Sequence, residues 1–88
     1  MNWKKRFPEL AHLESMEILA LVQRSGLSKY DRKAAINCLC WGMTDIESSV
    51  DDDVRMDRST VGKRLREIIV PELVWLDQKP KPESAAGA

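Results

Sequence analysis

The sequence is poor in the residues on which most catalytic and metal-binding sites depend. Its 88 residues include one histidine, His12, and two cysteines. No Ser-His-Asp or Cys-His set that this histidine would serve is visible, and no zinc ligand spacing appears. There is also no glycine-rich phosphate loop, and no calcium loop with its alternating acids and closing glutamate. We therefore expect no enzyme, and no bound metal or cofactor.

The two cysteines, Cys38 and Cys40, are equally uninformative as a crosslink. Residues two apart on a helix point to different faces, so we expect free thiols, which fit a reducing compartment. The N-terminus lacks the continuous apolar run of a signal peptide, and no segment is long enough to span a membrane. These observations predict a cytoplasmic protein without a membrane partner.

Glycine and proline are scarce as well, with four of each, and β-branched residues do not alternate with polar ones. This pattern favours helices over strands. A chain of this length forms one small domain. We predict an all-α fold, a four- to five-helix bundle over residues 8–77, preceded by a basic arm at 1–7 and followed by a disordered tail at 78–88.

Start signals place the first three predicted helices. Pro8 opens a helix over 8–24, and Ser28 with Asp31 forms a capping box for a central buried helix over 28–43. Thr44 and Glu47 repeat the capping pattern for a short helix over 45–50. The spacing of four between Ile46 and Val50 predicts that both side chains of this short helix point inward.

The predicted helix over 57–70 carries the strongest pattern in the chain. Asp57 is a good N-cap, and Val61, Leu65, Ile68 and Ile69 recur at the spacing of one buried face. Pro71 should stop or kink this helix near Val70. Residues 71–77 then form either a short final helix, which we prefer, or the first strand of a wing.

The opposite side of this helix carries hydrogen-bond donors. Such a surface suits the phosphates and base edges of a DNA major groove, although a charged outer face is also the ordinary surface of a globular protein. The candidate DNA-contacting residues, taken with their flanking cations, are Arg55, Arg58, Ser59, Thr60, Lys63, Arg64 and Arg66.

Charge is balanced overall but unevenly distributed. Fourteen cations match fourteen acids, so binding to nucleic acid by bulk charge is not expected and a DNA role must depend on local clustering. Cations predominate over residues 55–67, whereas the charged residues of 45–53 are all acidic. Asp51, Asp52 and Asp53 form either a solvated loop, a repulsive guide on DNA, or a second site for a protein partner.

Two phrases in the sequence resemble the helix-turn-helix of sigma factor region 4, of response-regulator output domains and of small phage-type transcription regulators. They are Gly42-Met43-Thr44-Asp45-Ile46-Glu47 and Asp57-Arg58-Ser59-Thr60-Val61-Gly62-Lys63-Arg64-Leu65. The resemblance covers residues 34–70. The connection between the two phrases is longer than a tight helix-turn-helix turn by about one helical turn, which a winged-helix variant accommodates.

The resemblance implies a sequence-specific transcriptional regulator, of a size common in phages and mobile elements, that binds double-stranded DNA with the helix after Asp57. One such helix contacts few base pairs, so specificity requires a homodimer or a larger complex, through the first helix or the region of Trp75. The alternative is a helical interaction module that binds polymerase, a nuclease or another regulator through its acidic loop or apolar surface.

Overall fold

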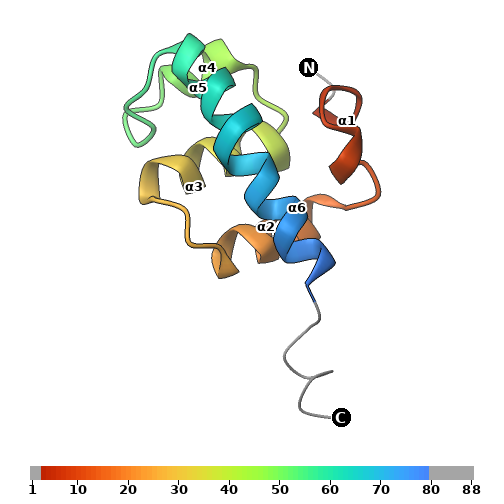
Figure 1. Ribbon diagram of the computed structural model, residues 1–88. Coiled ribbons are helices and arrows are strands. Elements are labelled where there is room, and N and C mark those ends of the chain that lie inside the picture. The colour runs from red at the N-terminus through yellow and green to blue at the C-terminus, as the bar shows by residue number, and fades with distance from the viewer. Residues whose placement is uncertain (1–2, 80–88) are drawn as a thin grey trace, which may run out of the picture.

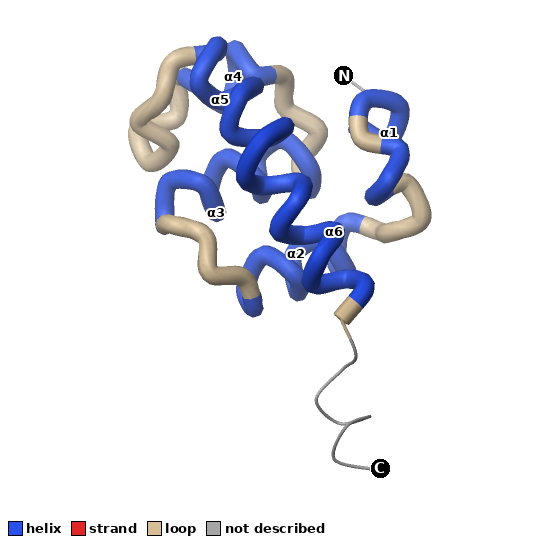
Figure 2. Tube along the Cα trace, in the orientation of Figure 1, coloured by secondary structure: helices blue, strands red, loops and turns tan. Residues whose placement is uncertain are grey.

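The computed structural model describes residues 3–79, and every regular element in this range is helical (Figures 1 and 2). This confirms the all-α prediction and leaves no wing strand within these residues. The elements are α1 (Trp3–Arg6), the 3-10 turn η1 (Pro8–Leu10), α2 (Ser15–Arg24), α3 (Lys29–Ala35), η2 (Ile36–Cys40), α4 (Asp45–Ser49), α5 (Arg58–Arg64), η3 (Leu65–Ile69) and α6 (Val70–Gln78). Both η2 and η3 are π-helical segments that continue the helix before them.

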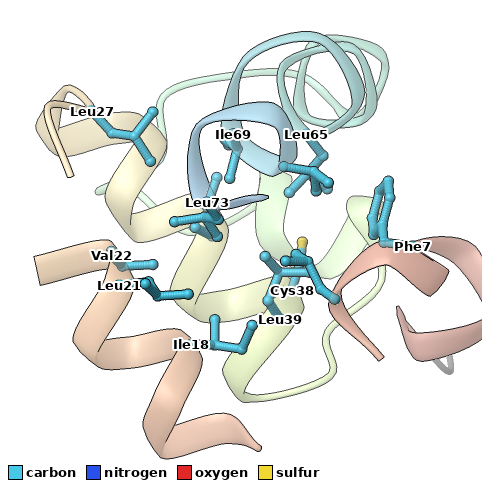
Figure 3. Close-up of a cluster of buried hydrophobic side chains, with 14 of the residues drawn as sticks. Phe7, Ile18, Leu21, Val22, Leu27, Cys38, Leu39, Leu65, Ile69 and Leu73 are labelled. Atoms are coloured by element: carbon cyan, nitrogen blue, oxygen red, sulfur yellow. The ribbon is translucent and has the colours of Figure 1, made fainter. Parts of the chain in front are cut away.

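The core forms where α2 and the α3–η2 helix meet the long helix made of α5, η3 and α6. Leu65, Ile69 and Leu73 are fully buried along that long helix. Figure 3 shows their side chains pointing toward those of α2 and η2, including Ile18 and Leu39. Each of these side chains loses its contact with water on folding, which stabilises the bundle by roughly 1.5–3 kcal/mol per residue.

The N-terminal segment differs from the prediction of one continuous helix over residues 8–24. The chain bends twice between residues 6 and 15, because Phe7, Leu10 and Leu13 are all buried and their spacing of three suits turns rather than an α-helix face. The helix predicted over 8–24 therefore consists of η1 and α2. Since Phe7 is 5 % exposed, α1 is held against the core and residues 3–7 are part of the domain.

The central helix begins as predicted, with the Ser28 hydroxyl accepting the N–H of Asp31. It ends in the π-helical segment η2, where the N–H of Trp41 donates to the carbonyl of Ile36. Gly42 then turns the chain with a φ of 71°. Trp41, expected in the buried run, is 69 % exposed because it lies at the C-cap, beyond the packed face.

The predicted orientation of α4 is wrong. Its capping box at Thr44 is confirmed, but Ile46 and Val50 are 54 % and 77 % exposed. Ser48 is the buried residue, and its hydroxyl accepts a hydrogen bond from the amide of Asn37, which is itself 1 % exposed. A buried amide without partners is costly, so the polar side of α4 faces the protein.

Near Val70, where Pro71 was predicted to stop or kink the helix, the π-helical segment η3 ends and α6 begins, so the chain does not stop but continues as a helix to Gln78. The N–H of Val70 bonds to the carbonyl of Leu65, five residues back. This wider turn gives space to the proline ring, which would clash with a carbonyl in a regular helix. Ile68, expected on the buried face, is 40 % exposed within the same π-helical segment.

The preferred alternative for residues 71–77, a helix packed on the core, is confirmed. Leu73 and Leu76 are buried in α6, whereas Trp75 is 55 % exposed. Of the predicted tail, Gln78 belongs to α6, and residues 80–88 lie outside the described part of the chain.

Gly62 is the point of close approach between α4 and α5. A Cβ at this position would lie 2.8 Å from Oδ2 of Asp45 and 3.3 Å from a guanidinium nitrogen of Arg6. These two side chains form a two-pronged ion pair, with N–O distances of 2.7 and 3.0 Å. The ion pair is thus seated directly on the glycine and ties α1 to α4.

We predict that Gly62→Ala destabilises the protein. Overpacking costs about 1–3 kcal/mol and the better helix propensity of alanine returns about 1 kcal/mol, so a net loss near 1 kcal/mol is expected in chemical denaturation. Gly26→Ala is the matched control, because its new Cβ would have no neighbour closer than 4.0 Å. Equal stability of the Gly62→Ala variant and the parent protein would show that the ion pair moves away freely.

Candidate nucleic-acid interface

The candidate interface begins at the N-terminus of α5, where Asp57 acts as the predicted N-cap. Its carboxylate accepts the backbone N–H of Thr60 at 2.7 Å. This hydrogen bond, with a second from the Thr60 hydroxyl, lowers the pKa of Asp57 below its ordinary value of 3.8. The cap fixes the start of the helix and so the direction in which its first side chains point.

Five of the predicted contact residues share an exposed surface, which we call the α5 face. Ser59 and Lys63 are one turn apart, and Thr60 lies beside them. Val61 and Leu65 are fully buried on the side away from Ser59 and Lys63 and hold the helix to the core, whereas Arg58 continues their stripe into the exposed first turn. The α5 face consists of Arg58, Ser59, Thr60 and Lys63 of α5 together with Arg66 of η3, whose guanidinium lies beside Gly62 and the Arg6–Asp45 ion pair.

The cations of the α5 face have no carboxylate partners. Among residues 3–79, no ion pair involves Arg58, Lys63 or Arg66. An unpaired, solvated cation can give up its water to a phosphate without first breaking an internal bond. The α5 face is therefore open to an anionic partner.

Arg64 differs from the prediction, because it turns to the flank of α5 and binds Asp31 of α3. Its Nε donates to Oδ1 at 3.0 Å and its Nη2 donates to Oδ2. This hydrogen bonding raises the pKa of Arg64, and Asp31 is only 2 % exposed. A buried carboxylate requires such a partner, so Arg64 joins α5 to α3 and is not part of the α5 face.

Arg55 is also separate from the α5 face. It lies in the connection between α4 and α5 with a φ of 55°, and its guanidinium is 6.0 Å from the ring centroid of Tyr30 on α3. Val54, fully buried, pins this connection to the core. The long connection inferred from the sequence is thus anchored on the protein.

The acidic segment does not neutralise the α5 face. Asp51 accepts from the amide of Asn37 at 2.9 Å and from the backbone N–H of Asp53, and both bonds lower its pKa. The Lys33 ammonium forms an ion pair with Oδ2 of Asp51, at 3.8 Å. Asp51 therefore faces α3, and only Asp52 and Asp53 remain exposed for the protein contact considered from the sequence.

Several apolar side chains that the sequence pattern assigned to the core are exposed instead. They lie on either side of α4 and on α6, and Trp75 borders a hollow of about 600 Å³ between α1 and α6. A helical period alone does not reveal them, since their exposure follows from polar contacts elsewhere. They are Trp41, Ile46, Val50 and Trp75, and Met16 of α2 and Ile68 of η3 are exposed as well.

Comparison with protein-family models, with curated proteins and with solved structures finds no match. Within the described residues, no helix is both long and apolar enough to cross a membrane, and no three metal-ligating side chains gather at one point. The function of this chain must therefore be argued from the contact of α4 with α5 and from the surface around them.

We predict that Asp57→Ala lowers the melting temperature at pH 7 by about 4–8 °C, since an N-cap is lost. Because the folded protein holds the pKa of Asp57 below 3.8, this contribution is present above that pH and is lost as the pH falls further. The difference between variant and parent should thus shrink in acid. Asp52→Ala, at an exposed position without a cap, should leave the melting temperature unchanged, and an equal loss there would refute the capping role.

Proposed function

We propose that this chain is a small DNA-binding transcriptional regulator that inserts the α5 face into the major groove of duplex DNA. The observation that carries the proposal is the α5 face itself, on which unpaired cations and two hydroxyls project from a helix anchored by buried apolar residues. Two nearby acids are engaged elsewhere, Asp57 as a cap and Asp51 with Asn37 and Lys33, whereas Glu67 beside Arg66 is exposed.

The side chains of the α5 face match the chemistry of a groove. Arg58 and Lys63 can donate to the acceptor edge of guanine or to phosphates, and the Ser59 and Thr60 hydroxyls can bond to either. These groups occupy the first two turns of α5, the part of a recognition helix that reaches base edges. The zero net charge of the chain means that affinity must come from this local surface.

The helix arrangement adds support. α4 contacts α5 directly, and the fully buried Val54 holds the connection between them. The outward side chains of α5 are thereby presented on a braced support, as sequence readout by a short helix requires. A single α5 face spans few base pairs, so we further propose that the protein binds DNA as a dimer or with a partner.

We predict that Arg58→Ala and Lys63→Ala each weaken DNA binding by roughly 1–3 kcal/mol if they reach bases. Duplexes enriched from a random pool by the parent protein would serve as ligands, with affinity measured by fluorescence anisotropy at fixed salt. Arg24→Ala, an exposed cation at the end of α2, is the charge-matched control. Undiminished affinity in both variants, each with the circular dichroism spectrum of the parent protein, would remove the proposed role.

The second candidate function is a protein-interaction module. Ile46 and Val50 favour it, because they lie one turn apart on α4 with both side chains mainly exposed. Ionic strength separates the two functions. DNA binding should weaken steeply as salt rises, whereas an apolar protein contact should respond little.

A further inference from the structure

A second cationic site lies beside the α5 face, in a hollow of about 300 Å³ between the start of α3 and the connection that precedes α5. Its lining combines three cations, one aromatic ring and one carboxylate. The lining residues are Lys29, Tyr30, Lys33, Asp53 and Arg55. We propose that this hollow, which we call the Tyr30 hollow, binds a phosphate group, and that the group is a backbone phosphate of the duplex held by the α5 face.

The cations of the Tyr30 hollow converge on one ring. The Lys29 ammonium lies 5.2 Å from the centroid of Tyr30, and the Arg55 guanidinium lies 6.0 Å from it. Each of these cations is attracted to the negative face of the aromatic ring. A phosphate accepts hydrogen bonds from both cations, and the Tyr30 hydroxyl is a further donor.

The acids of the hollow reduce this positive charge without cancelling it. Asp51 takes part in an ion pair with Lys33, and it is also held by Asn37. Asp53 is the one carboxylate that lines the hollow itself. Lys29 and Arg55 form no ion pair within residues 3–79, so their charge is available to a ligand.

The backbone of Arg55 provides an independent observation. It is the single non-glycine residue of the described chain with a left-handed φ, a conformation that costs free energy and that glycine adopts freely. Val54 is buried and Asp57 is a cap, so the chain must turn within two residues between them. Glycine would make this turn at lower cost, and strained positions of this kind cluster at ligand clamps.

The position of the hollow fits a backbone strand that borders the groove. Arg55 precedes the first residue of the α5 face, Arg58, by three positions, and Figure 1 shows the connection leading directly into the start of α5. Phosphate contacts on the flank of a recognition helix fix its register on the duplex. The inference therefore rests on the proposed function for the source of the phosphate.

Tyr30 makes the proposal directly measurable, because it is the one tyrosine of the chain. A sample with isotope-labelled tyrosine rings gives a single set of ring signals in NMR. Titration with an enriched duplex should shift these signals in step with binding. Inorganic phosphate, titrated separately, tests whether the hollow takes a free anion.

Arg55→Gln is the main variant, and we predict that it weakens duplex binding by about 3- to 10-fold at 0.1 M salt. The slope of log affinity against log salt should fall by about 1, equally for different DNA sequences, because one phosphate contact is lost. Arg24→Gln removes the same charge from α2 and should alter neither quantity. Arg55→Gly should weaken binding similarly while keeping or raising the melting temperature, which separates lost contact from misfolding.

The outcomes distinguish the two proposals. Duplex binding with unchanged Tyr30 signals, or with the parent's salt slope in Arg55→Gln, would overturn the phosphate site and leave the DNA-binding proposal standing. Absence of duplex binding by the parent protein would refute that proposal instead. A saturable shift of Tyr30 by inorganic phosphate, abolished in Arg55→Gln, would then support a phosphate site with another source, and no shift would overturn it.

Discussion

The ion pair between Asp31 and Arg64 is the contact on which the proposed interface depends. A carboxylate that is 2 % exposed must be matched by a cation, and Arg64 supplies two hydrogen bonds from the flank of α5. This fixes the rotation of α5 about its axis, so that Lys63, the neighbour of Arg64, projects into solvent. The same pair sets the position of Tyr30, which precedes Asp31, and so links the α5 face to the Tyr30 hollow.

Two further polar contacts decide how α4 lies. Arg6 binds Asp45 at the start of α4, and Asn37 bonds to Ser48 near its end. Because both contacts are on one side, the apolar residues of α4 face solvent, against the hydrophobic pattern. The energy of satisfying buried polar groups has here outweighed the burial of two aliphatic side chains.

The sequence predicted what depends on neighbours along the chain. The caps at Ser28, Thr44 and Asp57 were identified from spacing, and each accepts the expected backbone N–H, although the Asp31 carboxylate, expected to complete the box at Ser28, binds Arg64 instead. The buried positions Val61 and Leu65 follow from the same local period. Local rules suffice at these sites because each cap and each helical face is complete within a few residues.

The errors lie where distant residues decide. Asp31, the partner of Arg64, is 33 residues away in the sequence. A helical period does not show that a cation on the edge of α5 binds a buried carboxylate of α3. Pro71 was expected to stop or kink the helix, and the π-helical segment before it, with Ile69 and Leu73 packed on the core, lets the helix continue through the proline. The strained conformation of Arg55 likewise follows from the fixed positions on both sides of it.

Net charge is a poor guide to this protein because its ion pairs sort the cations into two classes. Within residues 3–79, Arg6 and Arg64 are held by carboxylates and act in the fold, whereas no ion pair involves the cations of the α5 face or Lys29 and Arg55 of the Tyr30 hollow. The charged side chains that remain outside these ion pairs form local surfaces of one sign, although the net charge of the chain is zero. Electrostatic attraction at contact distance depends on these local surfaces, since salt screens the remaining charges beyond about 8–10 Å. In the proposed function, affinity for DNA therefore depends on the α5 face and the Tyr30 hollow and not on the net charge of the chain.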